Sequence, residues 1–210
     1  MRALCAWVVV MVCPLLVAAD NQRVALFDGQ TFQGWEGDTK KTWKIEDGCI
    51  VGGSLDAVVP RNEFLCTTKT YENFELKVTF KLLGDKALAN AGIQFRTRRI
   101  PNDHEVIGYQ ADIGQHYWGA LYDESRRRKI LAQPPKEKLE KLVKHHEWNE
   151  YVIRCEGPRI RLWLNGELTV DYTEPDEKIE RRGVIGLQIH GGAKAQVYYK
   201  DITIMELPGK

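Results

Sequence analysis

Residues 73–82 read NFELKVTFKL, and this stretch indicates the fold class of the chain. Apolar side chains occupy one parity and polar side chains the other: Phe74, Leu76, Val78, Phe80 and Leu82 alternate with Glu75, Lys77, Thr79 and Lys81. Because successive side chains of a β-strand point to opposite faces, this pattern predicts a strand with one buried and one solvated face.

Two dipeptides mark tight hairpin turns. Apolar residues alternate on both sides of Asn165-Gly166 in RIRLWLNGELTVDY (159–172), where Leu168, Val170 and Tyr172 follow the turn. The second stretch, WKIEDGCIVGG (43–53), turns at Asp47-Gly48. Both dipeptides suit hairpins because a two-residue type I′ turn needs φ > 0 at its two central residues.

The remaining periodic segments also favour strands. Alternation predicts strands at 91–97, 107–113, 117–122, 148–155, 183–190 and 196–206. One segment, PPKEKLEKLVKHHEW (134–148), has an apolar stripe at helical spacing, so we expect one short helix near 135–146. Many strands separated by turn signals predict an all-β chain folded as a β-sandwich.

The first twenty residues, MRALCAWVVVMVCPLLVAAD, have the pattern of an export signal. Arg2 precedes an apolar run, and Val17-Ala18-Ala19 provides small residues at signal-peptidase spacing. The run is short for a bilayer span, which needs about 20 apolar residues. We therefore expect a signal peptide at 1–19 and a single secreted or periplasmic domain at 20–210, with an uncleaved anchor as the alternative.

Charge and cysteine content restrict the partners. Lys+Arg 30 against Asp+Glu 29 favours neither nucleic acid nor a membrane surface as a partner, and the oligomeric state stays open. After signal removal three cysteines remain, Cys49, Cys66 and Cys155, which allow one disulfide at most. Their spacing fits no zinc motif, and Cys155 lies at a buried parity, so we expect no disulfide.

Three predicted strands carry polar pairs at i, i+2 opposite an apolar face. The pairs are Gln94 and Arg96, Gln110 and Asp112, and Gln188 and His190, and the stretch 118–124 adds Trp118, Tyr122 and Glu124 on one parity. Amides, carboxylates and guanidinium groups hydrogen-bond sugar hydroxyls, while aromatic rings pack on pyranose faces. The pattern predicts a carbohydrate site, and an ordinary solvated sheet face is the alternative.

Several classes of site are not indicated. The chain has no Gly-x-Ser-x-Gly, no His-Glu-x-x-His and no phosphate-binding loop. No close pair of carboxylates indicates an ordinary glycosidase. Asp112, Glu124, His116 and His190 are potential metal ligands, but no spacing requires a metal, so we expect neither metal nor cofactor.

Eight stretches resemble, in order, the 3-keto-disaccharide hydrolase family, formerly a domain of unknown function. They are LFDGQTFQGWEG (26–37), WKIEDGCIVGG (43–53), ENFELKVTFKL (72–82), NAGIQFRT (90–97), GYQADIG (108–114), YWGALYDESRRR (117–128), residues 147–174 and GVIGLQIHGG (183–192). The resemblance covers nearly all of residues 24–207. It implies a concanavalin-A-like jelly roll of two antiparallel sheets, and substrates that are glycosides oxidised to a ketone at C3.

The implied reaction assigns roles to the polar residues. A ketone at C3 acidifies the C2 proton, so a base can form an enolate, the C1 substituent can leave, and water can add back. His190 is the candidate base because imidazole titrates near neutral pH. Arg96 or an amide would stabilise the enolate, and Tyr122 or Asp112 would protonate the leaving group. The candidate substrate-binding residues are Gln94, Gln110, Gln188, Trp118 and Glu124.

One departure from the family leaves alternatives open. The resemblance implies Tyr-Glu-x-Gln-x-x-Asp in many relatives where this chain has Tyr109-Gln110-Ala111-Asp112, so Gln110 stands at a carboxylate position. An amide cannot act as a base. Asp112 could take over the role, the substrate could differ, or the chain could be a non-catalytic carbohydrate-binding module on the same fold.

Overall fold

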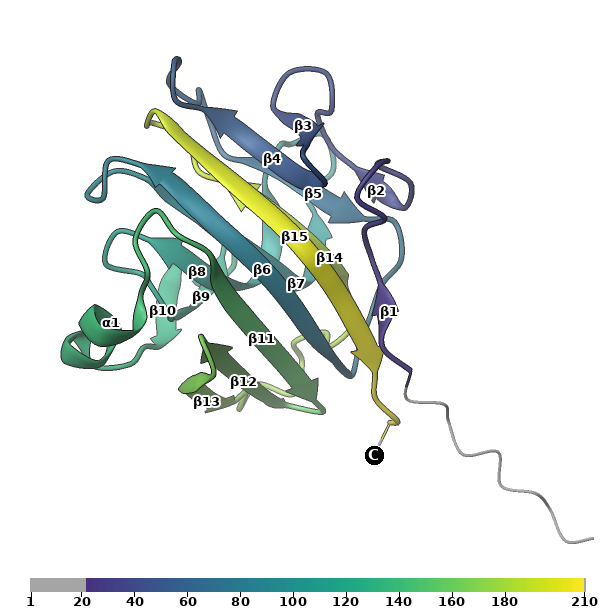
Figure 1. Cartoon of the computed structure of the whole chain (residues 1–210). Helices are drawn as coiled ribbons and strands as arrows, with labels where there is room; N and C mark the ends of the chain where they lie inside the picture. Colours follow the sequence, from purple (N-terminus) through teal and green to yellow (C-terminus); the bar gives the residue numbers. More distant parts are fainter. Residues whose placement is uncertain (1–21, 210) are drawn as a thin grey trace, which may run out of the picture.

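The computed structural model describes residues 22–209, so the predicted signal segment 1–19 lies outside the described residues. Within this range, fifteen strands form two antiparallel sheets, and there is one helix. In Figure 1, β15, β6 and β11 lie in the near layer, and β14, β7 and β8 lie behind it. A large apolar cluster, which includes Leu76, Ile93 and Leu187, fills the space between the sheets. The all-β prediction is confirmed.

The near layer is an eight-stranded sheet with the order β13-β12-β11-β6-β15-β4-β3, and β1 pairs with β15. Its strands are β1 (Val24–Ala25), β3 (Trp43–Glu46), β4 (Cys49–Ser54), β6 (Phe74–Gly84), β11 (Asn149–Glu156), β12 (Arg159–Leu164), β13 (Glu167–Thr173) and β15 (Ala195–Glu206).

The far layer is a seven-stranded sheet with the order β10-β9-β8-β7-β14-β5-β2. Its strands are β2 (Trp35–Glu36), β5 (Glu63–Thr67), β7 (Asn90–Arg99), β8 (Val106–Gly114), β9 (Leu121–Glu124), β10 (Lys129–Ala132) and β14 (Val184–Ile189). The helix α1 (Lys136–Leu142) follows β10. It is shorter than predicted because Val143 is extended and the Asn149 side chain bonds both the N–H and the carbonyl of Lys144.

Both predicted hairpin turns are present. Asp47 and Gly48 have φ of 49° and 71°, and Asn165 and Gly166 have φ of 50° and 85°. The alternation expected after Asn165-Gly166 is wrong at Leu168, which is 40% exposed. A β-bulge pairs Leu162 with Val170 but Trp163 with Leu168, so the extra residue changes the face on which Leu168 lies.

Residues 117–120, predicted as the start of a strand, form a turn instead. Tyr117 N donates to Gly114 O at 3.0 Å, and Ala120 N donates to Tyr117 O at 2.9 Å. Gln115 adopts φ 48° and Gly119 adopts φ 73°, which continue no strand. The strand β9 therefore begins only at Leu121.

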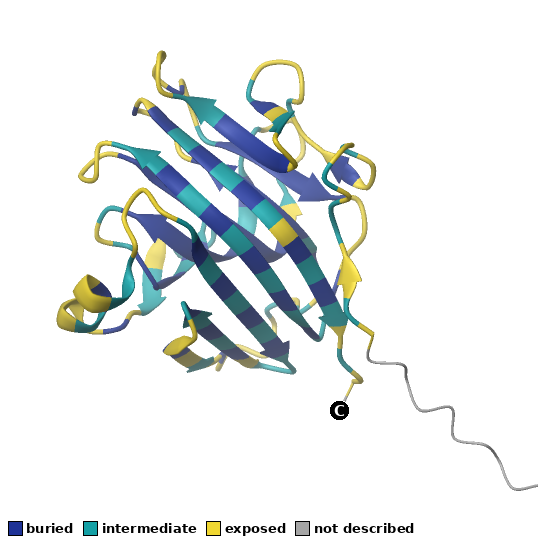
Figure 2. Cartoon of the chain, viewed as in Figure 1, coloured by how far each residue is buried: buried dark blue, intermediate teal, exposed yellow. Residues whose placement is uncertain are grey.

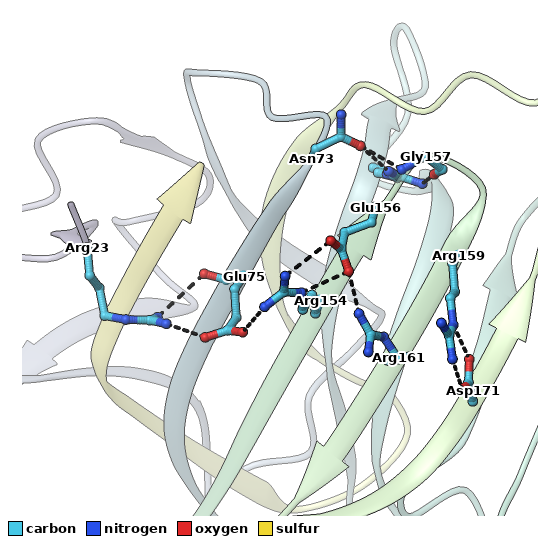
Figure 3. Close-up of polar contacts among 10 residues, drawn as sticks. Arg23, Asn73, Glu75, Arg154, Glu156, Gly157, Arg159, Arg161 and Asp171 are labelled. Atoms are coloured by element: carbon cyan, nitrogen blue, oxygen red, sulfur yellow. Dashed lines mark hydrogen bonds and ion pairs between the residues drawn. The ribbon is translucent and has the colours of Figure 1, made fainter. Parts of the chain in front are cut away.

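The outer face of the eight-stranded sheet is a solvated surface. Buried and half-buried residues alternate along β6, β11 and β15 (Figure 2). Ion pairs connect neighbouring strands, and Arg154 lies between Glu75 and Glu156, which also pair with Arg23 and Arg161 (Figure 3). Such part-exposed pairs each contribute little stability, so this face has the character of ordinary wet surface.

The outer face of the seven-stranded sheet, unlike that of the eight-stranded sheet, is partly buried. A second small apolar cluster of Phe64, Cys66 and Val106 lies on it, with Val184 against its side. Arg99 Nη2 donates to the Glu36 carbonyl at 2.7 Å and to the Phe64 carbonyl at 3.2 Å, which holds the end of β7 across β5. The polar side chains of Gln94, Gln110, Asp112 and Gln188 on this sheet are each at most 3% exposed, so the solvated-face alternative is wrong for them.

No helix within residues 22–209 is long and apolar enough to cross a bilayer. Cys49, Cys66 and Cys155 are buried free thiols, as expected from the parity of Cys155. Burial raises the pKa of Cys66 to about 11 and that of Cys155 to about 12, so both are protonated at neutral pH.

Candidate functional site

A cavity of about 250 Å³ lies on the outer face of the seven-stranded sheet, over β8 and β9. It brings together five of the predicted site residues: Gln110, Asp112, Tyr122, Glu124 and His190. Asn62, Asn90, Gln115 and Tyr117 complete its lining. These four were missed, although Asn90 shares the parity of Gln94 on its strand and could have been found from the sequence.

Strand register explains why these side chains meet. Gln110 on β8 is the partner of Tyr122 on β9 and of Gln94 on β7, and Asp112 is the partner of Gly92. A Cβ on Gly92 would lie 2.3 Å from Gln110 Cδ. The glycine therefore lets the Gln110 side chain lie flat across β7, where Gln94 Nε2 donates to its Oε1 at 2.6 Å.

The Asp112 carboxylate lies at the floor of the cavity and is only 3% exposed. It accepts hydrogen bonds from Asn90 Nδ2 at 3.2 Å, from Ile113 N at 3.1 Å and from Gln110 Nε2 at 3.1 Å. Burial nevertheless outweighs these bonds and raises the pKa of Asp112 to about 8, and the negative charge of Glu124 adds to the shift.

Glu124 is a second carboxyl group that titrates near neutral pH. Burial raises its pKa to about 7, and the neighbouring Glu105 carboxylate adds to the shift. Burial also raises the pKa of Tyr122 above its ordinary value. One small cavity thus holds two carboxyl groups that can give or take a proton near pH 7, as acid–base chemistry requires.

His190 lies at the exposed rim of this cavity. Its Nδ1 is 2.7 Å from the Gly191 carbonyl oxygen, which can only accept, so Nδ1 carries the proton and Nε2 of the neutral ring is free to take one. Gly191 N in turn donates to Asn62 Oδ1 at 3.0 Å, and Asn62 Nδ2 donates to Glu105 Oε1 at 3.0 Å. Asn62 therefore connects the turn that carries His190 to the segment that carries Glu105.

The prediction that Arg96 joins this cluster is wrong. Arg96 has φ 48° where the β7–β8 register shifts, and its guanidinium donates to the carbonyls of Glu72 (2.7 and 2.9 Å) and Gly157 (2.7 Å). These bonds connect β7 to the segment before β6, which contains Glu72, and to the turn after β11, which contains Gly157. The side chain is not part of the cavity lining, so it is not positioned to stabilise an enolate there.

Trp118 also lies outside this cavity. It is 7% exposed and belongs to the core, stacked on Phe80 with 6.2 Å between ring centroids, because residues 117–120 turn instead of alternating. Gln94 and Gln188 are fully buried and do not line the cavity either. Gln94 supports Gln110, whereas the Gln188 amide has no hydrogen-bond partner within the described part of the chain.

The candidate metal ligands do not form a metal centre. Within residues 22–209, no group of three or more His, Cys, Asp or Glu side chains is arranged to hold a metal ion. Asp112, Glu124 and His190 share the cavity, while His116 lies on the far side of the 115–118 turn, away from its lining.

Comparisons with known proteins place the chain among carbohydrate-related domains. Residues 22–205 match the family model described as the 3-keto-alpha-glucoside-1,2-lyase-like domain. A 3-keto-disaccharide hydrolase of Bacteroides thetaiotaomicron is 33% identical over 93 residues, which cover 41% of this chain and 31% of that protein. The match therefore spans about a third of the length of this curated relative.

Solved structures share the fold. A Parabacteroides distasonis protein provisionally designated a glycosyl hydrolase is 21% identical with a TM-score of 0.65, over 89% of this chain and 94% of that one. The Bacillus subtilis carbohydrate-binding module CBM66 is 15% identical with a TM-score of 0.63, over 82% and 96%. A Bacillus subtilis protein with a galectin-like fold is 10% identical with a TM-score of 0.62, over 90% and 96%. At these identities the likeness shows the fold alone, and it confirms the predicted jelly roll.

Proposed function

Because this chain belongs to the 3-keto-alpha-glucoside-1,2-lyase-like family, we propose that it cleaves glycosides that carry a ketone at C3. The proposed reaction removes the C2 proton, eliminates the C1 substituent and then adds water across the double bond. Family and structural neighbours relate the chain to carbohydrates, and the curated relative is named for 3-keto-disaccharides. We further propose that residues 20–210 act as one secreted or periplasmic domain, supported by the sequence pattern at 1–19.

One observation carries this proposal: Asp112 and Glu124, with pKa values of about 8 and about 7, share a cavity with His190. Elimination needs a base for C2, a donor for the enolate oxygen and an acid for the departing oxygen. Two carboxyl groups that titrate near neutral pH, beside an imidazole whose Nε2 can accept a proton, meet that requirement.

The geometry supports one division of labour. His190 takes the C2 proton on Nε2 while the Gly191 carbonyl holds its Nδ1–H. Asp112, in its protonated form, donates to the C3 oxygen as negative charge develops there, a role first assigned to Arg96. Glu124 protonates the leaving oxygen, with Tyr122 beside it. In the hydration half, Glu124 takes a proton from water and His190 returns its proton to C2, so the proton count balances.

Gln110 has a supporting role in this scheme. The resemblance implies a carboxylate at this position in many relatives, but here Gln110 receives a hydrogen bond from Gln94 and donates one to Asp112. The scheme uses His190 and Glu124 for proton transfer and Asp112 as a hydrogen-bond donor, so it requires no acid at position 110.

The experiment is an NMR time course with methyl 3-keto-α-glucoside and full-length protein. Wild type should consume the substrate, and His190→Ala should lose turnover while remaining folded. His146 provides the matched control, because it lies outside the cavity and bonds the Gly84 carbonyl, so His146→Ala should retain turnover. Unchanged turnover in His190→Ala would remove this residue from the mechanism.

A non-catalytic carbohydrate-binding module is the second candidate. It is favoured by Gln110 at the family's carboxylate position and by the likeness to CBM66. Isothermal titration with unoxidised oligosaccharides separates the two functions. Strong binding to these sugars, with no product from the 3-keto substrate, would favour the binding module.

A further inference from the structure

A second cavity, of about 410 Å³, lies between the β8–β9 turn and the segments that flank α1. Its volume is in the range of small-molecule sites, which begin at roughly 300 Å³. The apolar part of its lining comes from Trp118, Pro134, Leu139 and Val143. None of the roles assigned above uses this space.

The two cavities share a wall. Gln115 lines both, Tyr117 lines the first, and Trp118 lines the second. The wall is held by its backbone, because Tyr117 N donates to Gly114 O at 3.0 Å and Gln115 adopts φ 48°. Gln115 Nε2 donates to the Leu88 carbonyl at 2.9 Å, which ties the wall to the β6–β7 connection. Since the two cavities adjoin at Gln115, a molecule that passes over this side chain could place one part in each cavity.

The lining of the second cavity suits an apolar ring better than a sugar. Both of its amides donate N–H groups to the protein: Gln115 to the Leu88 carbonyl and Gln133 to the His116 carbonyl. The rings of His116 and His145 are the other uncharged polar groups of the lining, and they offer few donors for the many hydroxyls of a second sugar. The charged side chains of Lys136 and Glu140 are 85% and 66% exposed, so they lie at the solvent side and leave the apolar walls uncharged.

We infer that the second cavity binds the leaving group of the substrate, and that this group is an apolar ring such as a phenol. The inference rests on the proposed function and deepens it, because it names aryl 3-keto-glycosides as the preferred substrates. The sugar then lies over Asp112 and Glu124, and the aryl group lies against Trp118, Leu139 and Val143.

Kinetics with two substrates test the inference. Val143→Trp fills the cavity, and Lys141→Trp places the same ring on α1 at an exposed position outside it. For 4-nitrophenyl 3-keto-α-glucoside, we expect Val143→Trp to raise KM about tenfold and Lys141→Trp to leave it unchanged. For methyl 3-keto-α-glucoside, KM should be the same in all three proteins. If Val143→Trp fails to fold, Val143→Phe adds less volume and repeats the test.

A binding measurement separates this inference from the proposed function. Ligand-observed NMR with free 4-nitrophenol should show binding to wild type and at least tenfold weaker binding to Val143→Trp, whether or not either keto-glucoside reacts. Failure of both keto-glucosides to react would overturn the proposed function and, with it, the leaving-group assignment. Turnover of both with equal KM, together with equal or absent phenol binding in wild type and Val143→Trp, would overturn the inference alone.

Discussion

Replacing Asp112 with asparagine should change how stability depends on pH. The buried carboxyl has its pKa raised from 3.8 to about 8, so the folded state binds a proton that the unfolded chain releases. Its contribution to stability is fully present below pH 3.8 and is lost as the pH rises toward 8. With about 1.4 kcal/mol per pH unit, the loss amounts to about 4 kcal/mol at pH 7.

The Asp112→Asn variant has no such proton to lose. The new amide can keep the bonds from Asn90 and Ile113 through its oxygen, but its amino group would face Gln110 Nε2, a donor pair that costs about 1 kcal/mol. At pH 7 the free energy of unfolding of the variant should therefore be about 3 kcal/mol larger than that of wild type. The variant avoids the loss of about 4 kcal/mol and gives up about 1 kcal/mol to the donor pair.

Urea unfolding at pH 5, 6, 7 and 8 measures this difference. The gap between Asp112→Asn and wild type should widen in favour of the variant by about 1.4 kcal/mol per pH unit from pH 5 to 7, and by less as the pH approaches 8. Asp171→Asn is the matched control, because Arg159 lowers the pKa of that exposed carboxyl and no such widening is expected. Parallel curves for wild type and Asp112→Asn would refute the raised pKa and the protonated role of Asp112.

Three further substitutions test separate parts of the site. Glu124→Gln should abolish turnover. In wild type, turnover should fall as the pH rises through about 7, because Glu124 acts in its protonated form. A flat profile from pH 6 to 8 would contradict this role. Asn62→Ala should lower kcat with little change in KM and shift the ring-nitrogen NMR signals of His190, because the turn that carries this residue loses its tie; unchanged signals would show that Asn62 does not position the ring. Arg96→Lys should lower the urea midpoint, because one amine cannot bond both carbonyls, yet leave kcat of the folded protein unchanged, and a large loss of kcat would return Arg96 to the mechanism.

The strands of the sandwich were predictable because alternation and turn chemistry are local properties. The alternation in 73–82 and the dipeptides Asp47-Gly48 and Asn165-Gly166 fixed a strand and two hairpins correctly. The same counting brought Gln110, Asp112 and Glu124 to one face, since their strands are regular between these positions.

Parity failed where the backbone stopped alternating. A positive φ at Arg96, a bulge between Leu168 and Val170 and the turn at 117–120 each broke the alternation of side chains. The cover over the outer face also escaped prediction, because Phe64 and Val106 meet there from strands distant in sequence. Burial is also what raises the pKa of Asp112, and residues from several strands and loops, such as Asn62, Asn90 and Tyr122, surround its cavity. The chemistry of the site therefore depends on tertiary contacts that a local pattern does not carry.

The most direct measurement follows the C2 proton of methyl 3-keto-α-glucoside by NMR in D₂O. Wild type should remove the C2 proton signal faster than buffer alone and release methanol, while His190→Ala should match the buffer rate. A wild-type protein that binds this sugar but leaves the C2 proton in place at the buffer rate would contradict the assignment of elimination chemistry to this cavity.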